Sequence, residues 1–254
     1  MEDKLNKALE HFNKEEYHSA IEEFNALIEE DPDNPYLYNN LGTAYYMVGQ
    51  QDKALEAYKK ALEIAPEVQG IYQNIADIYL SQGNVTDALV ELEKAININP
   101  DNPGPRYHFA RVLMQDFRFD SAINELEYVL DKAPQNIDAR YDLARAYFEE
   151  GNYNNSITEY KKIIELSPKN ADLHYHLGIV YEADSQIDEA IEQFNEAVKI
   201  NPAHFLAQKQ LGVLYCAKQE NSKAIEHFEN YLTLMTESED REEIEAIVKK
   251  IKAE

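Results

Sequence analysis

Seven polar side chains recur at intervals of 34 residues and form a column, meaning residues at the same position of successive windows. The column consists of Asn6, Asn40, Asn74, His108, Asp142, His176 and Gln210. None is the lysine or glutamate that commonly covers a solvated helix face. An amide both donates and accepts hydrogen bonds, so it matches the N–H and C=O groups of an extended peptide. Five members are predicted to bind a peptide: Asn40, Asn74, His108, Asp142 and His176. The alternative is ordinary hydrated helix surface.

Arginine is concentrated in the middle of the chain. Five of the six arginines are Arg106, Arg111, Arg118, Arg140 and Arg145. Arg111 and Arg145 share a column, and a neighbouring column contains Tyr107, Tyr141 and Tyr175. Guanidinium and phenol groups in a partly desolvated groove suit a carboxylate, a phosphate or an acidic side chain. Arg111, Arg145 and the three tyrosines are therefore added to the predicted peptide-binding residues.

The alternative interpretation is that the same arginines form structural ion pairs. Arg145 has Asp142 three residues before it and Glu149 four residues after it. On a helix these spacings bring opposite charges together. Arg111 would pair in the same way with acids of the next repeat. The sequence leaves both interpretations open.

Composition and charge narrow the class of protein. The 254 residues carry 24 Lys plus Arg against 48 Asp plus Glu, a formal net charge of −24. This charge opposes binding to nucleic acid and to anionic lipid. No apolar run approaches the roughly 20 residues of a membrane span, and the N-terminus lacks the order of a signal peptide. We expect a cytoplasmic protein that binds a protein or peptide, including an acidic one, and neither nucleic acid nor membrane.

Proline and small residues mark an internal repeat. Six of the nine prolines follow one another at intervals of 34 residues, namely Pro32, Pro66, Pro100, Pro134, Pro168 and Pro202. Because proline stops a helix, identical stops indicate a repeated helical element. One column of small residues is Ala8, Gly42, Ala76, Ala110, Ala144, Gly178 and Gly212. Another is Ala20, Ala54, Ala88, Ala122, Ser156, Ala190 and Ala224. Such columns indicate that two backbones approach closely.

Each window contains two helical stripes separated by a turn. Ala54, Tyr58 and Ala61, for example, lie at i, i+4 and i+7. The residues predicted to end the first helix with a positive φ are Gly49, Gly83 and Gly151. The predicted N-caps are Asn34, Asn102, Asn136 and Asn170, with Pro35 and Pro103 at the first helical position. Each window is a helix pair that must stack on its neighbours to bury both stripes.

The segment NNLGTAYYMVGQQDKALEAYKKALEIAP, residues 39–66, resembles the tetratricopeptide repeat (TPR), and the resemblance covers residues 1–238. It implies an all-α solenoid, a right-handed superhelix whose concave side is lined by the first helix of each pair. The predicted units are 1–34, 35–68, 69–102, 103–136, 137–170, 171–204 and 205–238. The sequence departs from the family pattern at Ser156, where a small alanine is expected, and at Phe117 and Ser185, where the turn glycine is expected.

The two ends of the array differ. Residues 239–254 are predicted to form a C-terminal capping helix, with Ile244, Ile247, Val248 and Ile251 on one face. At the N-terminus, Leu5, Leu9 and Phe12 point away from the predicted packing face. Either the first helix is rotated to bury them, or the chain forms a homo-oligomer through this helix.

Catalysis finds no support in the sequence. His108, Asp142 and His176 belong to successive pairs, and neighbouring helices lie ~8–10 Å apart, whereas zinc ligands lie ~2.0–2.2 Å from one ion. Cys216 has no histidine in its column, so a packed, inert thiol is expected. No glycine-rich phosphate loop or nucleophile elbow occurs. We expect no enzyme activity, no catalytic residue, no metal site and no cofactor.

The sequence therefore predicts a non-enzymatic scaffold that captures an extended peptide or acidic segment in its concave groove. Asn40 and Asn74 would contact the peptide main chain, and an acidic group would lie near Arg111 and Arg145. Two alternatives belong to other classes. One is a self-assembling structural protein, and the other is an accessory repeat domain of a larger enzyme or complex.

Overall fold

The computed structural model describes residues 2–237 and 239–253, and its helices fall into two compact units. The first unit ends at Pro134 and the second begins at Gln135. Three residues lie outside the described part of the chain: Met1, Ser238 and Glu254. In the predicted division, Met1 begins the first repeat, Ser238 ends the seventh, and Glu254 ends the capping helix. Throughout the described part of the chain the regular secondary structure is helical. None of the described helices combines the length and the apolar character needed to cross a membrane.

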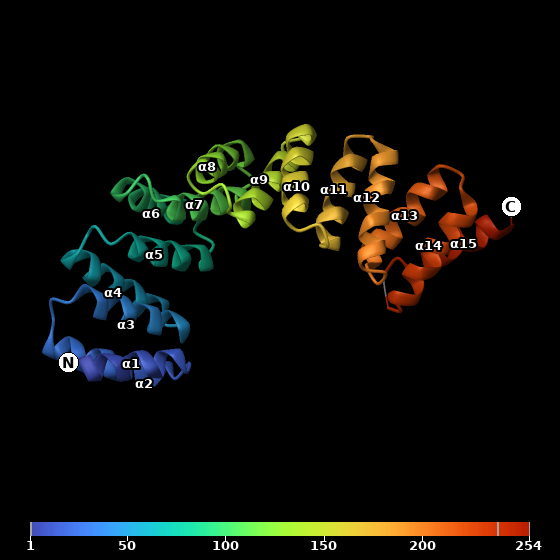
Figure 1. Cartoon of the computed structure of the whole chain (residues 1–254). Coiled ribbons are helices and arrows are strands. Elements are labelled where there is room, and N and C mark those ends of the chain that lie inside the picture. Colours follow the sequence, from blue (N-terminus) through green and yellow to red (C-terminus); the bar gives the residue numbers. More distant parts are fainter. Residues whose placement is uncertain (1, 238, 254) are drawn as a thin grey trace. The chain divides into compact units, whose positions relative to one another are not determined.

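Helix pairs build the first unit. In chain order they are α1 (Glu2–Asn13) with α2 (Tyr17–Glu30), α3 (Pro35–Met47) with α4 (Gln51–Ile64), α5 (Gln69–Ser81) with α6 (Val85–Ile98), and α7 (Pro103–Gln115) with α8 (Phe119–Lys132). Each pair packs against the next one (Figure 1). The first helices of neighbouring pairs are also in contact. Helix α5, for example, contacts both α3 and α7.

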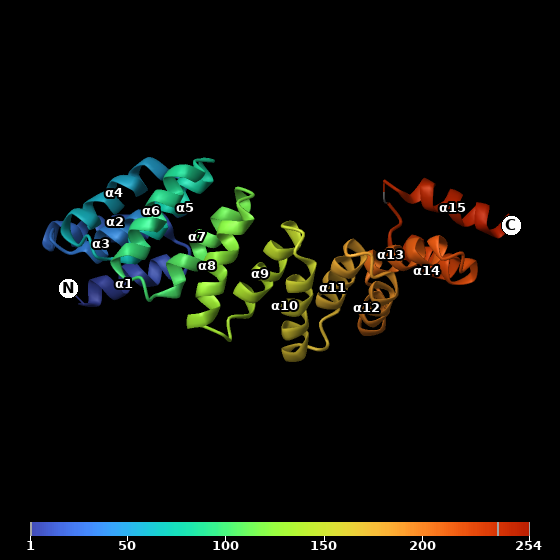
Figure 2. The same cartoon turned by 90° about the horizontal axis from the view of Figure 1, so that it is seen from above.

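The second unit repeats this arrangement and ends with a single helix. Its elements are α9 (Ile137–Glu149) with α10 (Tyr153–Leu166), α11 (Ala171–Ala183) with α12 (Ile187–Ile200), α13 (Phe205–Ala217) with α14 (Asn221–Leu234), and α15 (Arg241–Ala253). Helix α15 packs against α14 (Figure 2). It buries Ile244, Val248 and Ile251 in the core of the unit. The predicted C-terminal capping helix is thereby confirmed.

The helix ends follow the 34-residue spacing and the predicted local signals. The first helices from α3 onwards begin at residues 35, 69, 103, 137, 171 and 205. The side chains of the four predicted N-cap residues Asn34, Asn102, Asn136 and Asn170 each accept a backbone N–H from the first turn. Gly49, Gly83 and Gly151 have positive φ, and Phe117 and Ser185 adopt the same conformation without being glycine.

The small columns mark close contacts between the two helices of a pair. A Cβ atom on Gly178 would lie 2.6 Å from the ring of Phe194, and one on Gly212 would lie 2.5 Å from the ring of Phe228. Gly42 stands in the same relation to Tyr58, at 2.7 Å. These distances are shorter than any real Cβ contact, so in these three pairs the ring leaves no room for a Cβ atom.

Because of this contact, we expect Gly178→Ala to destabilise the parent chain but to stabilise a variant that lacks the Phe194 ring. Gly178→Ala gains about 1 kcal/mol of helix propensity but overpacks the core at a cost of about 1–3 kcal/mol, so we expect net destabilisation. In a Phe194→Leu background the same change copies Ala76 and Leu92, which are both fully buried, and we expect it to stabilise. Urea unfolding followed by circular dichroism measures all four proteins. A stabilising Gly178→Ala in the parent chain would contradict the close contact.

The N-terminal helix is engaged with the core of its unit. Leu5, Leu9 and Phe12 are half-buried and pack against a cluster that contains Ala8, Phe24 and other residues of α2 and α3. This favours burial of the three side chains, the first of the two predicted alternatives. Self-association through α1 stays a prediction, which light scattering over a concentration series tests.

Candidate functional site

The ten predicted peptide-binding residues all lie on the first helices of their pairs, and they fall into two groups. In the first unit, α3, α5 and α7 carry Asn40, Asn74, Tyr107, His108 and Arg111. In the second unit, α9 and α11 carry Tyr141, Asp142, Arg145, Tyr175 and His176. Each group is described within its own unit.

In the first unit, Asn74 makes a side-chain hydrogen bond to a neighbouring helix. The side-chain amide of Asn74 donates to the Oδ1 atom of Asn39, at 3.0 Å. Asn39 directly precedes Asn40, so the bond joins α5 to α3 through a different column. Asn40 is half-buried, and its side chain makes no hydrogen bond to the described residues of the first unit. Its amide is therefore available to a ligand, whereas the amide of Asn74 is partly occupied.

His108 holds two first helices together. Its Nε2 atom lies 3.1 Å from the Oδ1 atom of Asp77, which comes from α5. The histidine side chain is only 22% exposed. This contact accounts for a polar residue at this position without a metal ion. In residues 2–237 and 239–253, no group of three or more His, Cys, Asp or Glu side chains is arranged to hold one.

Arg111 is the most available cation among the predicted residues. It is exposed, and it makes no ion pair within the first unit. The guanidinium carbon lies 6.0 Å from the centroid of the Tyr107 ring, a cation–π arrangement. The ring restricts the guanidinium without neutralising its charge. Arg111 can therefore form a salt bridge with an acidic ligand.

In the second unit, Tyr141 and His176 form the centre of an aromatic cluster. The Tyr141 hydroxyl lies 3.0 Å from the Nε2 atom of His176, which joins α9 to α11. The His176 ring stacks on that of Tyr160 from α10, with the centroids 6.1 Å apart and the planes 14° apart. Burial raises the pKa of both tyrosine hydroxyls and lowers the pKa of His176.

The lowered pKa of His176 predicts a pH dependence. Its folded-state pKa lies below the value of about 6.5 expected for the unfolded chain. The unfolded chain therefore binds the proton more readily, and the unit loses stability as pH falls from about 6.5 towards the folded-state pKa. NMR titration of the imidazole resonances measures this directly. We expect a midpoint below 6.5, and a midpoint at or above 6.5 would contradict the buried position.

Arg145 is less available than Arg111. Its guanidinium Nη1 lies 3.7 Å from Oδ1 of Asp142, one helical turn earlier, and the Asp142 side chain is only 13% exposed. This contact supports the structural interpretation of Arg145 without hiding it, because half of its side chain stays exposed. Arg145 also lines a hollow of about 140 Å³ together with Glu149, Tyr160 and His176.

Tyr175 lies deeper than its column predicts. Its ring contacts Phe194 of the core and His204 before α13, with centroid distances of 5.7 and 4.9 Å. Burial raises the pKa of its hydroxyl. These contacts give Tyr175 a structural role in joining α11, α12 and α13. A separate hollow of about 370 Å³ is lined by Tyr141, His176 and the carboxylates Asp138 and Asp172.

Two of the bonds between neighbouring pairs share a spacing that the single columns do not reveal. Asn39 bonds Asn74, and Tyr141 bonds His176, and both partners are 35 residues apart. The fifth position of one window therefore faces the sixth position of the next. The sequence contains both columns, but comparison within one column at a time does not find the bond. Asn39 and Tyr160 contact the predicted peptide-binding residues without being among them, and Tyr160 is itself buried.

Models of the tetratricopeptide repeat match the chain several times. One described as a TPR repeat matches residues 8–49, 76–116 and 144–185. Three described as a tetratricopeptide repeat match residues 35–68, 113–156 and 171–204. Together the matches span residues 8–68 and 76–204. No curated protein matches the chain by sequence.

Solved structures share the fold at low sequence identity. The C-terminal part of a TPR repeat-containing protein from Cytophaga hutchinsonii is 18% identical, has a TM-score of 0.82, and is matched over 98% of its length by 94% of this chain. A tetratricopeptide repeat protein from Parabacteroides merdae is 21% identical, with a TM-score of 0.65 and 98% of both chains covered. YrrB, a TPR protein, is 24% identical, with a TM-score of 0.63 over 72% of this chain and 95% of its own. The predicted all-α TPR fold is confirmed, and the chain belongs to the tetratricopeptide repeat family.

Proposed function

We propose that this protein is a non-enzymatic scaffold that binds an extended, acidic peptide along the first helices of its pairs. The observation that carries the proposal is Arg111, which is exposed, unpaired within its unit and placed against the ring of Tyr107. In a chain with a net charge of −24, an unpaired arginine in this position attracts a carboxylate.

Asn40 supplies the complementary contact to the peptide backbone. Its side-chain amide carries both a donor and an acceptor, and none of the residues described in its unit uses them. Asn74 and His108 line the same helix faces and keep part of their hydrogen-bonding capacity. Such contacts read the peptide main chain, so they tolerate variation in the peptide sequence.

The second unit contributes a weaker site of the same kind. Arg145 would hold an acidic side chain while keeping Asp142 as its neighbour, and Tyr141 and His176 would form the adjacent wall. Tyr175 supports this wall from behind. The structural neighbour YrrB is described as a TPR protein with an unusual peptide-binding site, and TPR folds are typical of protein–protein interaction scaffolds. Both agree with the proposal.

A matched pair of arginine variants tests the proposal. The probe is a fluorescein-labelled peptide of sequence GDGDFDGDG, called the acidic peptide below. Hydrogen bonds to charged groups contribute about 1.5–3 kcal/mol, so we expect Arg111→Ala to weaken binding at least tenfold. Fluorescence anisotropy measures the affinity, which should also fall as salt is added.

The control is Arg118→Ala, which removes the same charge from the turn between α7 and α8. Arg118 is exposed and makes no ion pair within the first unit. We expect this variant to bind the acidic peptide within about twofold of the parent, since it keeps the contact at Arg111. Equal losses in both variants would show a general charge effect and would overturn the assignment of Arg111.

A further inference from the structure

A polar pair bridges the two helices in four of the helix pairs. In each case the partners are 19 residues apart, and they are Arg106 with Glu125 (2.7 Å), Arg140 with Glu159 (2.6 Å), His174 with Gln193 (2.9 Å), and Gln208 with His227 (2.7 Å). The first partner lies in the first turns of the first helix, and the second partner lies in the middle of the second helix. These side chains fill the space between the helices on that side of the pair.

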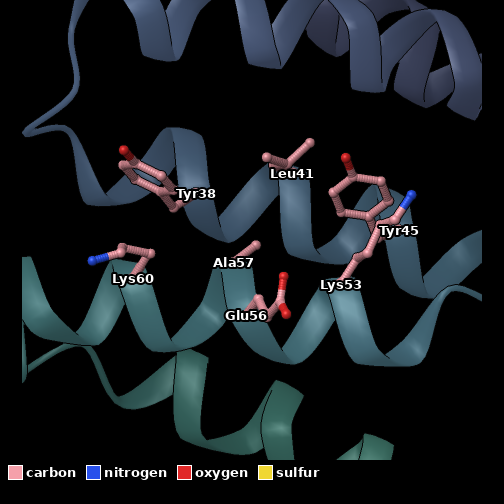
Figure 3. A pocket seen from close by; sticks show the side chains of 7 residues that line it. All are labelled: Tyr38, Leu41, Tyr45, Lys53, Glu56, Ala57 and Lys60. Atoms are coloured by element: carbon pink, nitrogen blue, oxygen red, sulfur yellow. The ribbon is translucent and has the colours of Figure 1, made fainter.

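The α3–α4 pair lacks this bridge. Tyr38 and Ala57 occupy the corresponding positions, again 19 residues apart. The methyl group of Ala57 reaches no partner across the helices, so the space stays open. A hollow of about 270 Å³ lies there, which we call the α3–α4 pocket (Figure 3).

The walls of the α3–α4 pocket are mainly apolar. Leu41 and Ala57 are each 6% exposed and form its floor. The rings of Tyr38 and Tyr45 project from α3 on either side of Leu41 (Figure 3). The pocket is smaller than the ~300–1,000 Å³ of sites for drug-sized ligands, so its volume suits a single side chain.

The rim of the pocket carries charged side chains. Lys60 lies at the Tyr38 end and Lys53 at the Tyr45 end, with Glu56 between them (Figure 3). The Lys53 ammonium lies 5.3 Å from the centroid of the Tyr45 ring and makes no ion pair within the first unit. Lys60 already forms an ion pair with Glu63, so Lys53 is the rim lysine that is available to an acidic partner.

We propose that the α3–α4 pocket receives one bulky apolar side chain of a partner peptide, with Lys53 binding an acidic residue beside it. The apolar floor selects the side chain, and the ammonium group of Lys53 selects its acidic neighbour. This inference rests on the proposed function, because the occupant is a peptide segment.

The same place in another pair shows why the α3–α4 pocket is distinct. A hollow of about 300 Å³ beside α7 is lined by Arg106, Glu125 and Glu93, of which the first two already bind each other. An apolar side chain placed there would have to separate a charge pair. A helix pair avoids this cost if it has a small residue at the position equivalent to Glu125. In the α3–α4 pair that residue is Ala57.

Closing the pocket tests the proposal with a double variant, Tyr38→Arg with Ala57→Glu. It copies the bridge between Arg106 and Glu125 and leaves the net charge of the chain unchanged. Each protein is titrated with the acidic peptide and with the same peptide carrying alanine in place of phenylalanine. We expect the parent to bind the phenylalanine peptide at least tenfold more tightly than the alanine peptide. For the double variant, we expect the two affinities to differ less than twofold. Equal differences on both proteins would overturn the proposal.

Two further measurements make every outcome decisive. NMR of the parent follows the methyl groups of Leu41 and Ala57, which should shift when the acidic peptide is added, and unshifted methyl groups would overturn the proposal even if the double variant fails to fold. The peptide GKGKFKGKG should bind the parent at least tenfold more weakly than the acidic peptide, and equal binding would contradict the role of Lys53.

If Arg111→Ala weakens binding while the double variant binds like the parent, the pocket assignment fails and the proposed function stands. If the parent does not bind the acidic peptide, both fail.

Discussion

Truncation of Phe194 to alanine is expected to lower the stability of the second unit by about 3–5 kcal/mol. The ring is fully buried between the backbone of α11 at Gly178 and the ring of Tyr175. Loss of the ring removes apolar burial and leaves a cavity beside a glycine, which has no side chain to fill it. Because α12 is held by neighbours on both sides, the helices cannot collapse into that space.

Amide hydrogen exchange along α12 measures this loss directly, since it reports the free energy of local opening. The control is Phe117→Ala, which removes the same ring from a position that is 80% exposed. We expect the control to change stability by no more than about 0.5 kcal/mol. A loss below about 1 kcal/mol for Phe194→Ala would show that the pair does not pack through this ring.

Glu159→Ala is expected to be the most damaging change among the charged residues, at about 3 kcal/mol. The carboxylate accepts hydrogen bonds from Arg140 at 2.6 Å and from Lys162 at 2.7 Å, and the residue is 8% exposed. Arg140 is also largely buried, with 14% of its side chain exposed. Removal of the carboxylate leaves that guanidinium in a poorly solvated place without its carboxylate partner.

Two controls separate this explanation from a simple loss of charge. Lys162→Ala removes the exposed partner, which is 49% accessible, and should cost less than about 1 kcal/mol. The double variant Arg140→Met with Glu159→Leu removes both buried charges and should recover most of the loss. Chemical denaturation compares the four proteins, and equal effects of Glu159→Ala and Lys162→Ala would contradict the buried pair.

The periodic part of the structure could be predicted from the sequence because it depends on local signals. Helix ends follow from Asn34 as N-cap and Pro35 at the first helical position, and turns follow from Gly49 and its equivalents. The small columns identified close contacts because a glycine such as Gly178 leaves room for a ring. These effects act over a few residues or repeat strictly, so one window predicts the others.

The side-chain partners of the binding surface could not be predicted in the same way. Asn74 bonds Asn39 and not Asn40, because neighbouring pairs are offset by one residue where they meet. A column places a residue on a helix face, but it does not give this offset. Tyr175 is predicted to bind a peptide, and its column does not show that its half-buried ring also contacts Phe194 and His204.

The α3–α4 pocket escaped the sequence analysis for a different reason. It arises from a side chain that is too short, Ala57, at a position where other pairs place a long polar residue. An alanine in a helix is unremarkable by itself, since alanine has the highest helix propensity. Its meaning depends on the bridges seen at Arg106 and Arg140, which only the packed helices reveal.

Peptide capture by the first helices is tested most directly by NMR of side-chain N–H groups during titration with the acidic peptide. We expect the Asn40 amide and the Arg111 guanidinium N–H resonances to shift together, while those of Asn25 on α2 and Asn97 on α6 stay in place. Shifts confined to Asn25 and Asn97, with Asn40 and Arg111 unmoved, would contradict it.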